Sequence, residues 1–121
     1  MPAPRNAAKP NSRAHRRPPG PAARAALIEL PAAGCDLPTP PLPKARQWSA
    51  GERARWLELW SSPQALMWED SAIGTVAVLL VYEAAILAGE ASAWQAQEAR
   101  YASEALGLTP KAMAALGWSI S

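Results

Sequence analysis

SAGERARWLELWSSPQALMWEDS, residues Ser49–Ser71, is the stretch where regular structure is predicted to begin. Ser49 is followed three residues later by Glu52, and this spacing is typical of a capping box, in which each side chain accepts a hydrogen bond from the other residue's backbone N–H. Three large apolar side chains then recur at helical spacing on one face: Trp56, Leu59 and Trp60. The pattern predicts an amphipathic helix that packs against a core.

A second, short helix is predicted directly after the first. Ser62 precedes Pro63, and proline is favoured at the first position of a helix because the N–H that it lacks would have no partner there. This helix would hold three further apolar residues: Leu66, Met67 and Trp68. Asp70 or Ser71 can then cap a third helix.

The segment Ala72–Gly89, AIGTVAVLLVYEAAILAG, is the most apolar in the chain, with Glu83 as its only charge. A helix that is apolar on all sides must be buried on all sides. A membrane span is one alternative, but the stretch is at the short limit for crossing, and a carboxylate in mid-bilayer costs about 2.5–3.5 kcal/mol. We therefore expect no membrane, and a central bundle helix whose surplus apolar face seals an interface between subunits. The expected interface residues are Ile73, Val76, Leu79, Leu80, Ile86 and Leu87.

Another helix is predicted to begin at Ser92, which forms a capping pair with Gln95, and to run to Leu106. One stripe of this helix carries four residues: Trp94, Glu98, Tyr101 and Ala105. The stripe mixes aromatic, acidic and small side chains.

The turn that follows, LGLTPKAMAALGW from Leu106 to Trp118, resembles the corner of a helix-turn-helix. Gly107 can end one helix in the left-handed conformation, Thr109 can cap the next, and Pro110 fits its first position. A DNA-reading helix needs side chains that reach base edges, and Lys111 is the single candidate for base reading here. We expect instead that this helix packs into the core through Met113, Leu116 and Trp118.

Together these elements predict an all-α fold, a small bundle of about four to five helices in residues 48–121. No strand is expected, although WSIS at the C-terminus could be extended. Four tryptophans should be mostly buried: Trp56, Trp60, Trp68 and Trp118. A helical region of this length has a marginal core, so we expect copies of the chain to associate into a homo-oligomer.

Residues 1–47 are predicted to form a basic, Pro-rich flexible arm and spacer, with disorder in the arm. Eleven of the 13 prolines precede Lys44. Within this region, Ala26–Gly34 contains a short apolar run that could dock on the domain or on a neighbour. The sequence LPTPPLPKA at 37–45 predicts a stiff polyproline II spacer.

Charge is divided between the two regions. The arm proper, residues 1–28, has six cations and no Asp or Glu: Arg5, Lys9, Arg13, Arg16, Arg17 and Arg24. Four more cations precede Trp56: Lys44, Arg46, Arg53 and Arg55. Acidic residues dominate the remainder of the chain. Contacts with DNA should therefore be phosphate contacts made by these ten residues, through charge and counterion release.

Catalytic constellations are scarce in the sequence. The only histidine, His15, lies in the arm, and Cys35 is the only cysteine. The chain has no Gly-rich phosphate loop and no cluster with metal-ligand spacing. We expect a protein that is not an enzyme and that needs no cofactor or metal. A reducing compartment fits the lone cysteine, and the N-terminus has no apolar segment that would predict export.

Two blocks of the sequence, in the order in which the family has them, resemble the small subunits of phage terminases, in particular a short type found in phages of actinobacteria. The first block, RWLELWSSPQALMWE, matches at Trp56, Leu59, Trp60, Pro63, Gln64, Ala65 and Trp68. The second, EARYASEALGLTPKAMAALGWSI, matches at Leu106, Gly107, Leu108, Thr109, Pro110, Leu116 and Trp118. The motifs RRPPG, ELPAAG and PPLP extend the resemblance over most of the chain.

This resemblance implies a non-catalytic, ring-forming protein in the cytoplasm of the infected bacterial host. Such a protein recognises viral double-stranded DNA and delivers it to the terminase large subunit, which holds the ATPase and nuclease. The sequence departs from the family at Ala114, Ala115 and Gly117, near which relatives tend to have arginine. Direct base reading by the last helix is therefore less expected here.

Two other functions fit the same residues. A helical scaffold or antitoxin-like regulator would use the Pro-rich arm to bind a protein in place of DNA. A small single-span membrane protein would place the apolar helix in a bilayer. Solution mass separates these from a closed ring.

Overall fold

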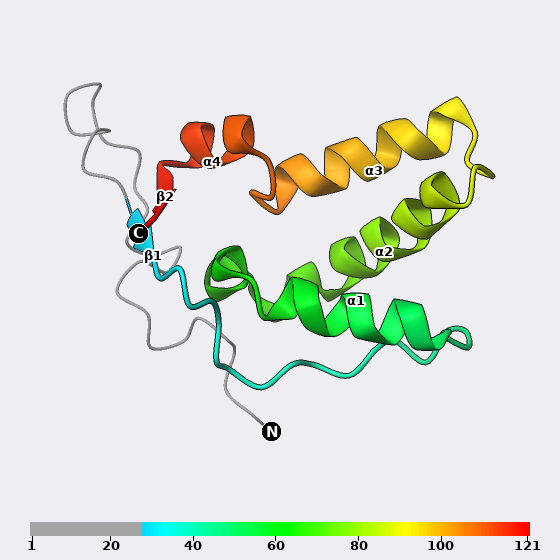
Figure 1. Cartoon of the computed structure of the whole chain (residues 1–121), viewed down its shortest axis with the longest axis horizontal. Helices are drawn as coiled ribbons and strands as arrows, with labels where there is room; N and C mark the ends of the chain where they lie inside the picture. The colour runs from blue at the N-terminus through cyan, green and yellow to red at the C-terminus, as the bar shows by residue number, and fades with distance from the viewer. Residues whose placement is uncertain (1–27) are drawn as a thin grey trace.

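A computed structural model of the chain describes residues 28–121, and these form a mostly helical fold closed by one short pair of strands (Figure 1). The elements in chain order are β1 (Ile28–Leu30), α1 (Ala50–Trp60), η3 (Pro63–Met67), η4 (Asp70–Ala72), α2 (Ile73–Leu87), α3 (Ala93–Ala105), α4 (Pro110–Leu116) and β2 (Trp118–Ile120), where η marks a 3₁₀ helix. The predicted helical bundle is confirmed in outline. The all-α prediction needs correction, because β1 and β2 form a sheet.

Helix starts follow the capping chemistry of the sequence. Ser49 Oγ accepts a hydrogen bond from Glu52 N at 3.1 Å, and the Glu52 carboxylate accepts one from Ser49 N at 2.9 Å. Ser92 and Gln95 repeat the same arrangement at α3, and Thr109 Oγ1 accepts from Ala112 N at 3.1 Å to start α4. These three predictions are confirmed.

The start of α2 was predicted wrongly. Asp70 and Ser71 do not cap it but lie inside η4, which runs directly into α2. The N-cap of α2 is Ala72, which makes no side-chain capping bond. A preceding turn of 3₁₀ helix takes the place of a capping side chain here.

The core is built on indole rings from α1 and the residues after it, which pack against one another at tilted and edge-on angles. Trp60 is fully buried and contacts Trp56 with ring centroids 5.7 Å apart and Trp68 edge-on at 5.1 Å. Trp68 Nε1 donates to the Leu106 carbonyl at 2.9 Å, which ties the end of α3 to this cluster. The predicted burial of Trp56, Trp60, Trp68 and Trp118 is confirmed.

Trp118 belongs to a second, smaller cluster with Leu30 and Met67. Its ring lies against Gly107, whose φ of +73° is the left-handed conformation predicted for this helix end. A Cβ at Gly107 would collide with the Trp118 ring. Half-buried Met113 packs on this cluster, but Leu116 is 38% exposed, so the prediction that Leu116 enters the core is wrong.

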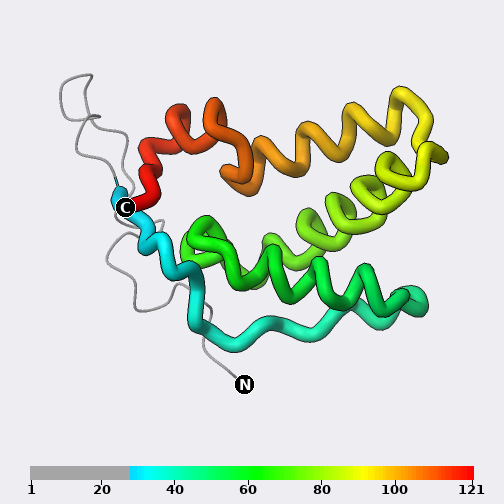
Figure 2. The backbone as a smooth tube through the Cα atoms, in the orientation of Figure 1, coloured from blue at the N-terminus to red at the C-terminus, as the bar shows by residue number. Residues whose placement is uncertain are grey.

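β1 and β2 are parallel, with Ile28 opposite Trp118 and Leu30 opposite Ile120. Ile28 N donates to the Gly117 carbonyl at 2.8 Å, just before the paired residues of β2. Figure 2 shows the first described residues beside the C-terminus. The alternative in which WSIS is extended is thus the one that the structure adopts, and its partner strand is Ile28–Leu30, part of the apolar run noted in the sequence.

The predicted spacer lies against the domain instead of standing away from it. In Figure 1 the segment between β1 and α1 runs along α1. Trp56 Nε1 donates to the Pro40 carbonyl at 2.7 Å and Trp48 Nε1 to the Pro43 carbonyl at 2.8 Å. The boundary at residue 47 is therefore wrong: residues 28–47 belong to the folded domain. The expectation of a disordered arm falls on residues 1–27, which lie outside the described residues.

α2 packs between α1 and α3 and has one face in the core (Figure 1). Val76, Leu79 and Leu80 form that face and are at most 3% exposed. These three side chains are buried within the chain itself, so the prediction that they lie in a subunit interface is wrong. Ile73 is half-buried, so Ile86 and Leu87 are the predicted interface residues that remain exposed.

Candidate nucleic-acid and subunit interfaces

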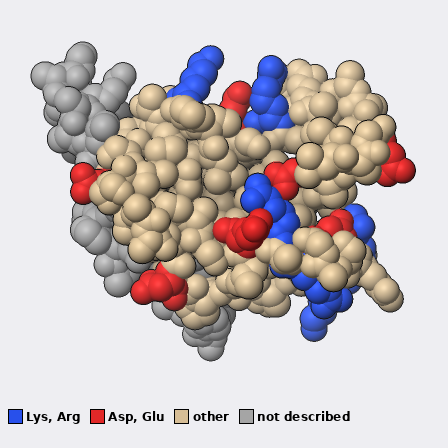
Figure 3. Space-filling model, in the orientation of Figure 1, with Lys and Arg blue, Asp and Glu red and all other residues tan. Residues whose placement is uncertain are grey.

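Three exposed cations gather at the start of α1: Lys44, Arg46 and Arg53, here called the α1 basic corner. Figure 3 shows cationic atoms at the lower right, over this end of the helix. The Arg46 guanidinium lies 4.8 Å from the centroid of the Trp48 ring, and Arg53 Nε donates to the Trp48 carbonyl at 3.2 Å. Trp48 therefore positions two guanidinium groups on the surface.

One carboxylate lies beside this corner. Arg46 Nη2 is 3.5 Å from Glu52 Oε2, a long contact for a charge-assisted bond. The other oxygen of Glu52 is occupied by the capping box. The corner thus keeps an excess of positive charge, and its arrangement suits contacts with a phosphate backbone.

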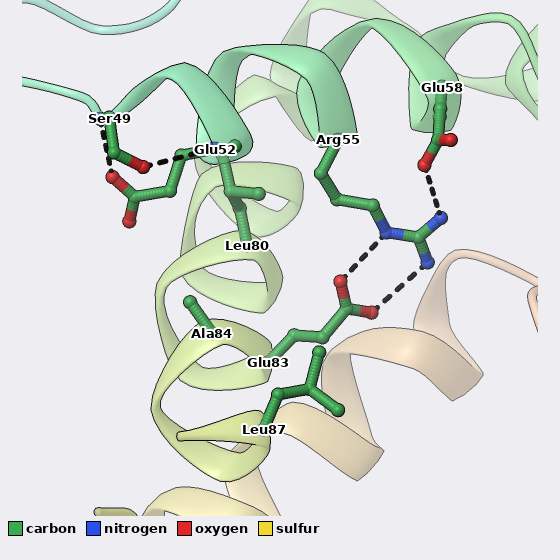
Figure 4. A pocket seen from close by; sticks show the side chains of 9 residues that line it. Ser49, Glu52, Arg55, Glu58, Leu80, Glu83, Ala84 and Leu87 are labelled. Carbon is green, nitrogen blue, oxygen red and sulfur yellow. Dashed lines mark hydrogen bonds and ion pairs between the residues drawn. The ribbon is translucent and has the colours of Figure 1, made fainter.

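Arg55 was predicted to contact phosphate, but its guanidinium is held by two carboxylates (Figure 4). Nε and Nη2 donate to the two oxygens of Glu83 at 2.7 and 3.1 Å, and Nη1 donates to Glu58 at 3.2 Å. The hydrogen bond to Glu83 is the main cause that raises the pKa of Arg55 above its ordinary value. Arg55 links α1 to α2, and a DNA phosphate would have to compete with these two carboxylates for its guanidinium.

A groove of about 550 Å³ lies beside this ion pair, between α1 and α2. Leu80, Ala84 and Leu87 line it with apolar surface, and Arg55 and Glu83 line it with charges that pair with each other (Figure 4). The groove therefore offers no unpaired acid–base couple. Within residues 28–121, no group of three or more His, Cys, Asp or Glu side chains is placed to hold a metal ion.

α4 presents little that could read bases. Its exposed residues are Pro110, Lys111, Ala114, Ala115 and Leu116. Lys111 is the only one with a hydrogen-bonding side chain, so its role in base reading stays a prediction. Nearby Ile120 is also 42% exposed, which makes the α4–β2 end more apolar than basic.

The outer face of α2 is the main apolar surface. Val78 and Ile86 are 44% and 40% exposed, and Leu87, at the end of the helix beside the α1–α2 groove, is 81% exposed. Asp70–Leu87 is long and apolar enough to cross a membrane, with a mean hydropathy of 1.7, and 17% of this segment is buried in the fold. Exposed apolar surface is present on α2, as expected from the sequence. It includes Ile86 and Leu87 from the predicted interface, together with Val78, but not the buried Val76, Leu79 and Leu80.

Sequence reasoning missed three residues of these surfaces. Val78 lies four and eight residues before Tyr82 and Ile86, so helical spacing could have placed it on their face. Glu83 is 28 residues from Arg55, and no local pattern indicates that pairing. The role of Trp48 depends on the fold of the segment before α1.

The six predicted phosphate contacts of the arm, Arg5 to Arg24, lie outside the described residues. No family model, curated protein or solved structure matches the chain. The terminase resemblance therefore stands on the sequence blocks alone.

Proposed function

We propose that the chain is the small subunit of a viral DNA-packaging terminase. In this proposal it is non-catalytic, binds viral double-stranded DNA, forms a homo-oligomer, and recruits or regulates the large ATPase and nuclease subunit in the cytoplasm of the infected bacterial host. One observation carries the proposal beyond the resemblance: the division of charge between the first 27 residues and the domain.

Residues 1–27 hold six of the 12 Lys and Arg residues and none of the ten Asp and Glu residues, a net charge of +6. Residues 28–121 hold the other six cations and all ten acidic residues, a net charge of −4. Duplex DNA carries about one negative charge per 1.7 Å. Its backbone attracts the first segment and repels most of the domain, with the α1 basic corner as the local exception.

The apolar surfaces support the other parts of the proposal. The exposed face of α2, with Val78 and Ile86, suits contact with a second copy, because large exposed apolar patches on a small domain mark interaction sites. Leu116 and Ile120 at the α4–β2 end suit a protein partner such as the large subunit. These same two residues favour the second candidate, a helical scaffold or regulator whose Pro-rich arm binds a protein.

Titration of duplex DNA at several salt concentrations tests the proposal. The full chain is compared with a full-length variant in which the six cations of residues 1–27 are changed to Gln, and with a second variant, Lys44→Gln, Arg46→Gln and Arg53→Gln. The first variant should lose most binding. Six contacts give a slope of log K against log salt no steeper than about −5, from roughly −0.9 per phosphate. Binding that neither variant weakens would reject the DNA proposal and favour the scaffold.

A further inference from the structure

α3 carries an aromatic and acidic stripe, Trp94, Glu98 and Tyr101, that the proposed function does not use. The spacing of four and then three residues places all three side chains on one face of the helix. Trp94 is 58% exposed and Tyr101 is 47% exposed. They are the only exposed aromatic residues in the part of the chain that the structure describes.

Neighbouring side chains hold the two rings in place. Tyr82 of α2 packs edge-on against Trp94, with ring centroids 5.8 Å apart. Gln97 Nε2 donates a hydrogen bond to the Tyr101 hydroxyl at 2.7 Å. The two rings are therefore held in position before a ligand binds, so that binding costs little side-chain entropy at these residues.

Glu98 lies between these rings and is half-buried. Within the described residues, Glu98 has no ion pair and no side-chain hydrogen bond. Trp94, in contrast, packs against Tyr82, and the Tyr101 hydroxyl accepts a hydrogen bond from Gln97. A carboxylate flanked by exposed aromatic rings favours a ligand that is cationic and partly apolar. Arg100, whose guanidinium lies 5.3 Å from the Tyr101 centroid, shows within this chain that the ring accepts such a group.

A symmetric contact with a second copy fits the stripe poorly. It would bring two Glu98 carboxylates into a shared apolar interface, where like charges repel strongly. The segment missing from the described structure fits it better. Residues 1–27 contain six cations, six prolines and no carboxylate, and Pro-rich segments bind aromatic-lined surfaces in an extended form.

We propose that Trp94, Glu98 and Tyr101 are a docking site for the chain's own first 27 residues. Arginine side chains of that segment pair with Glu98 and stack on the rings, and its prolines pack on Trp94. The segment joins the domain at Ile28, at the opposite end of the domain from the start of α3 (Figure 1). Extended, its 27 residues span up to about 90 Å, several times the length of about 20 Å of α3, so it can reach the stripe.

Docking has a consequence that rests on the proposed function. The cations that contact Glu98 and the rings are the same ones that would contact DNA phosphates. DNA must therefore displace the segment from α3, and the stripe lowers the affinity of the protein for any duplex. The site therefore weakens binding to random DNA, because DNA phosphates must compete with Glu98 and the rings for the same arginine and lysine side chains.

The direct test compares NMR spectra of the full chain and the full-length variant with its six N-terminal cations changed to Gln, without DNA. We expect the largest shift differences at the Trp94 indole N–H and at the backbone amides of Glu98 and Tyr101. The same signals should move toward those of the variant when salt is raised. Unchanged signals at these three residues, or larger changes elsewhere in residues 28–121, would overturn the docking site.

A second test uses two variants of α3 that each remove one carboxylate. Glu98→Gln should raise the affinity for a random duplex about two- to fivefold, the range of one exposed ion pair, more than Glu104→Gln, which lies off the stripe and is 4.0 Å from Arg100. Equal effects would mean that only net charge matters and would reject the site. If the spectra show docking but no variant binds DNA, the proposed function fails and the docking site stands.

Discussion

Arg55 of α1 and Glu83 of α2 form a two-pronged ion pair, with Nε 2.7 Å from Oε1 and Nη2 3.1 Å from Oε2. The two residues are 28 positions apart, so the pair fixes how the two helices lie against each other. Both side chains are partly exposed, at 42% and 27%. Solvent therefore screens the interaction, and its contribution to stability is modest.

The first prediction concerns this pair. A double-mutant cycle with Arg55→Gln and Glu83→Gln should give a coupling of about 1 kcal/mol in urea unfolding, at the upper end for exposed pairs because the geometry is bidentate. The control is Arg100 and Glu104, which are 4.0 Å apart and should couple by close to zero. Equal coupling in the two cycles would show that the bidentate geometry adds nothing.

The second prediction concerns the indole core. Trp60→Ala should destabilise the fold by about 3–5 kcal/mol, because it leaves a cavity at a fully buried position. Trp94→Ala is the matched control, since Trp94 is 58% exposed and its loss should change stability by only about 0.5 kcal/mol. Urea denaturation followed by circular dichroism measures both. Similar losses in the two variants would contradict the described core.

The third prediction concerns where the domain begins. A chain that starts at residue 28 should unfold at nearly the same urea concentration as the full chain. A chain that starts at residue 48 loses Leu30 and the carbonyls that Trp48 and Trp56 bond, and should lose more than about 3 kcal/mol. If both truncated chains are equally stable, residues 28–47 do not support the fold.

The fourth prediction separates the two faces of α2 with the same substitution. Val78→Glu, on the exposed face, should leave the helices folded but release smaller species, measured by sedimentation and circular dichroism. Val76→Glu, two residues away and fully buried, should unfold the domain, because an unpaired carboxylate would be buried. A folded Val78→Glu protein of unchanged mass would place the subunit interface elsewhere.

The fifth prediction concerns Lys111. Lys111→Ala should change the affinity for viral and random duplexes by less than about twofold, since a single exposed phosphate contact contributes little beside six others. The helix-turn-helix alternative expects the reverse, with the preference for viral sequence lost. Parallel titrations of both duplexes decide between them.

Local chemistry made much of this fold predictable from the sequence. The caps at Ser49, Ser92 and Thr109 depend on residues three positions apart, and the left-handed Gly107 follows from its place before a capped helix. Burial of the tryptophans follows from their size and helical spacing. Such features need no knowledge of the rest of the chain.

The remainder depends on contacts between distant residues. β1 and β2 are three residues each and pair across 90 positions, so neither has a local signal strong enough to predict it. An all-round apolar helix does not reveal which side its neighbours cover, and this is why Val76, Leu79 and Leu80 were assigned to the wrong surface. The pairing of Arg55 likewise could not be predicted without the position of Glu83.

The parallel pairing of β1 and β2 also has a mechanical consequence. Tension between the N-terminal segment and the C-terminus would enter β1 at Ile28 and β2 at Ile120, which lie at opposite ends of the paired strands. The two strands would be pulled in opposite directions along their length, so the load would be shared as shear by all the hydrogen bonds between them. If the N-terminal segment binds a moving duplex, the force would load all the hydrogen bonds between β1 and β2 at the same time. The helices would then not be separated by breaking one hydrogen bond after another.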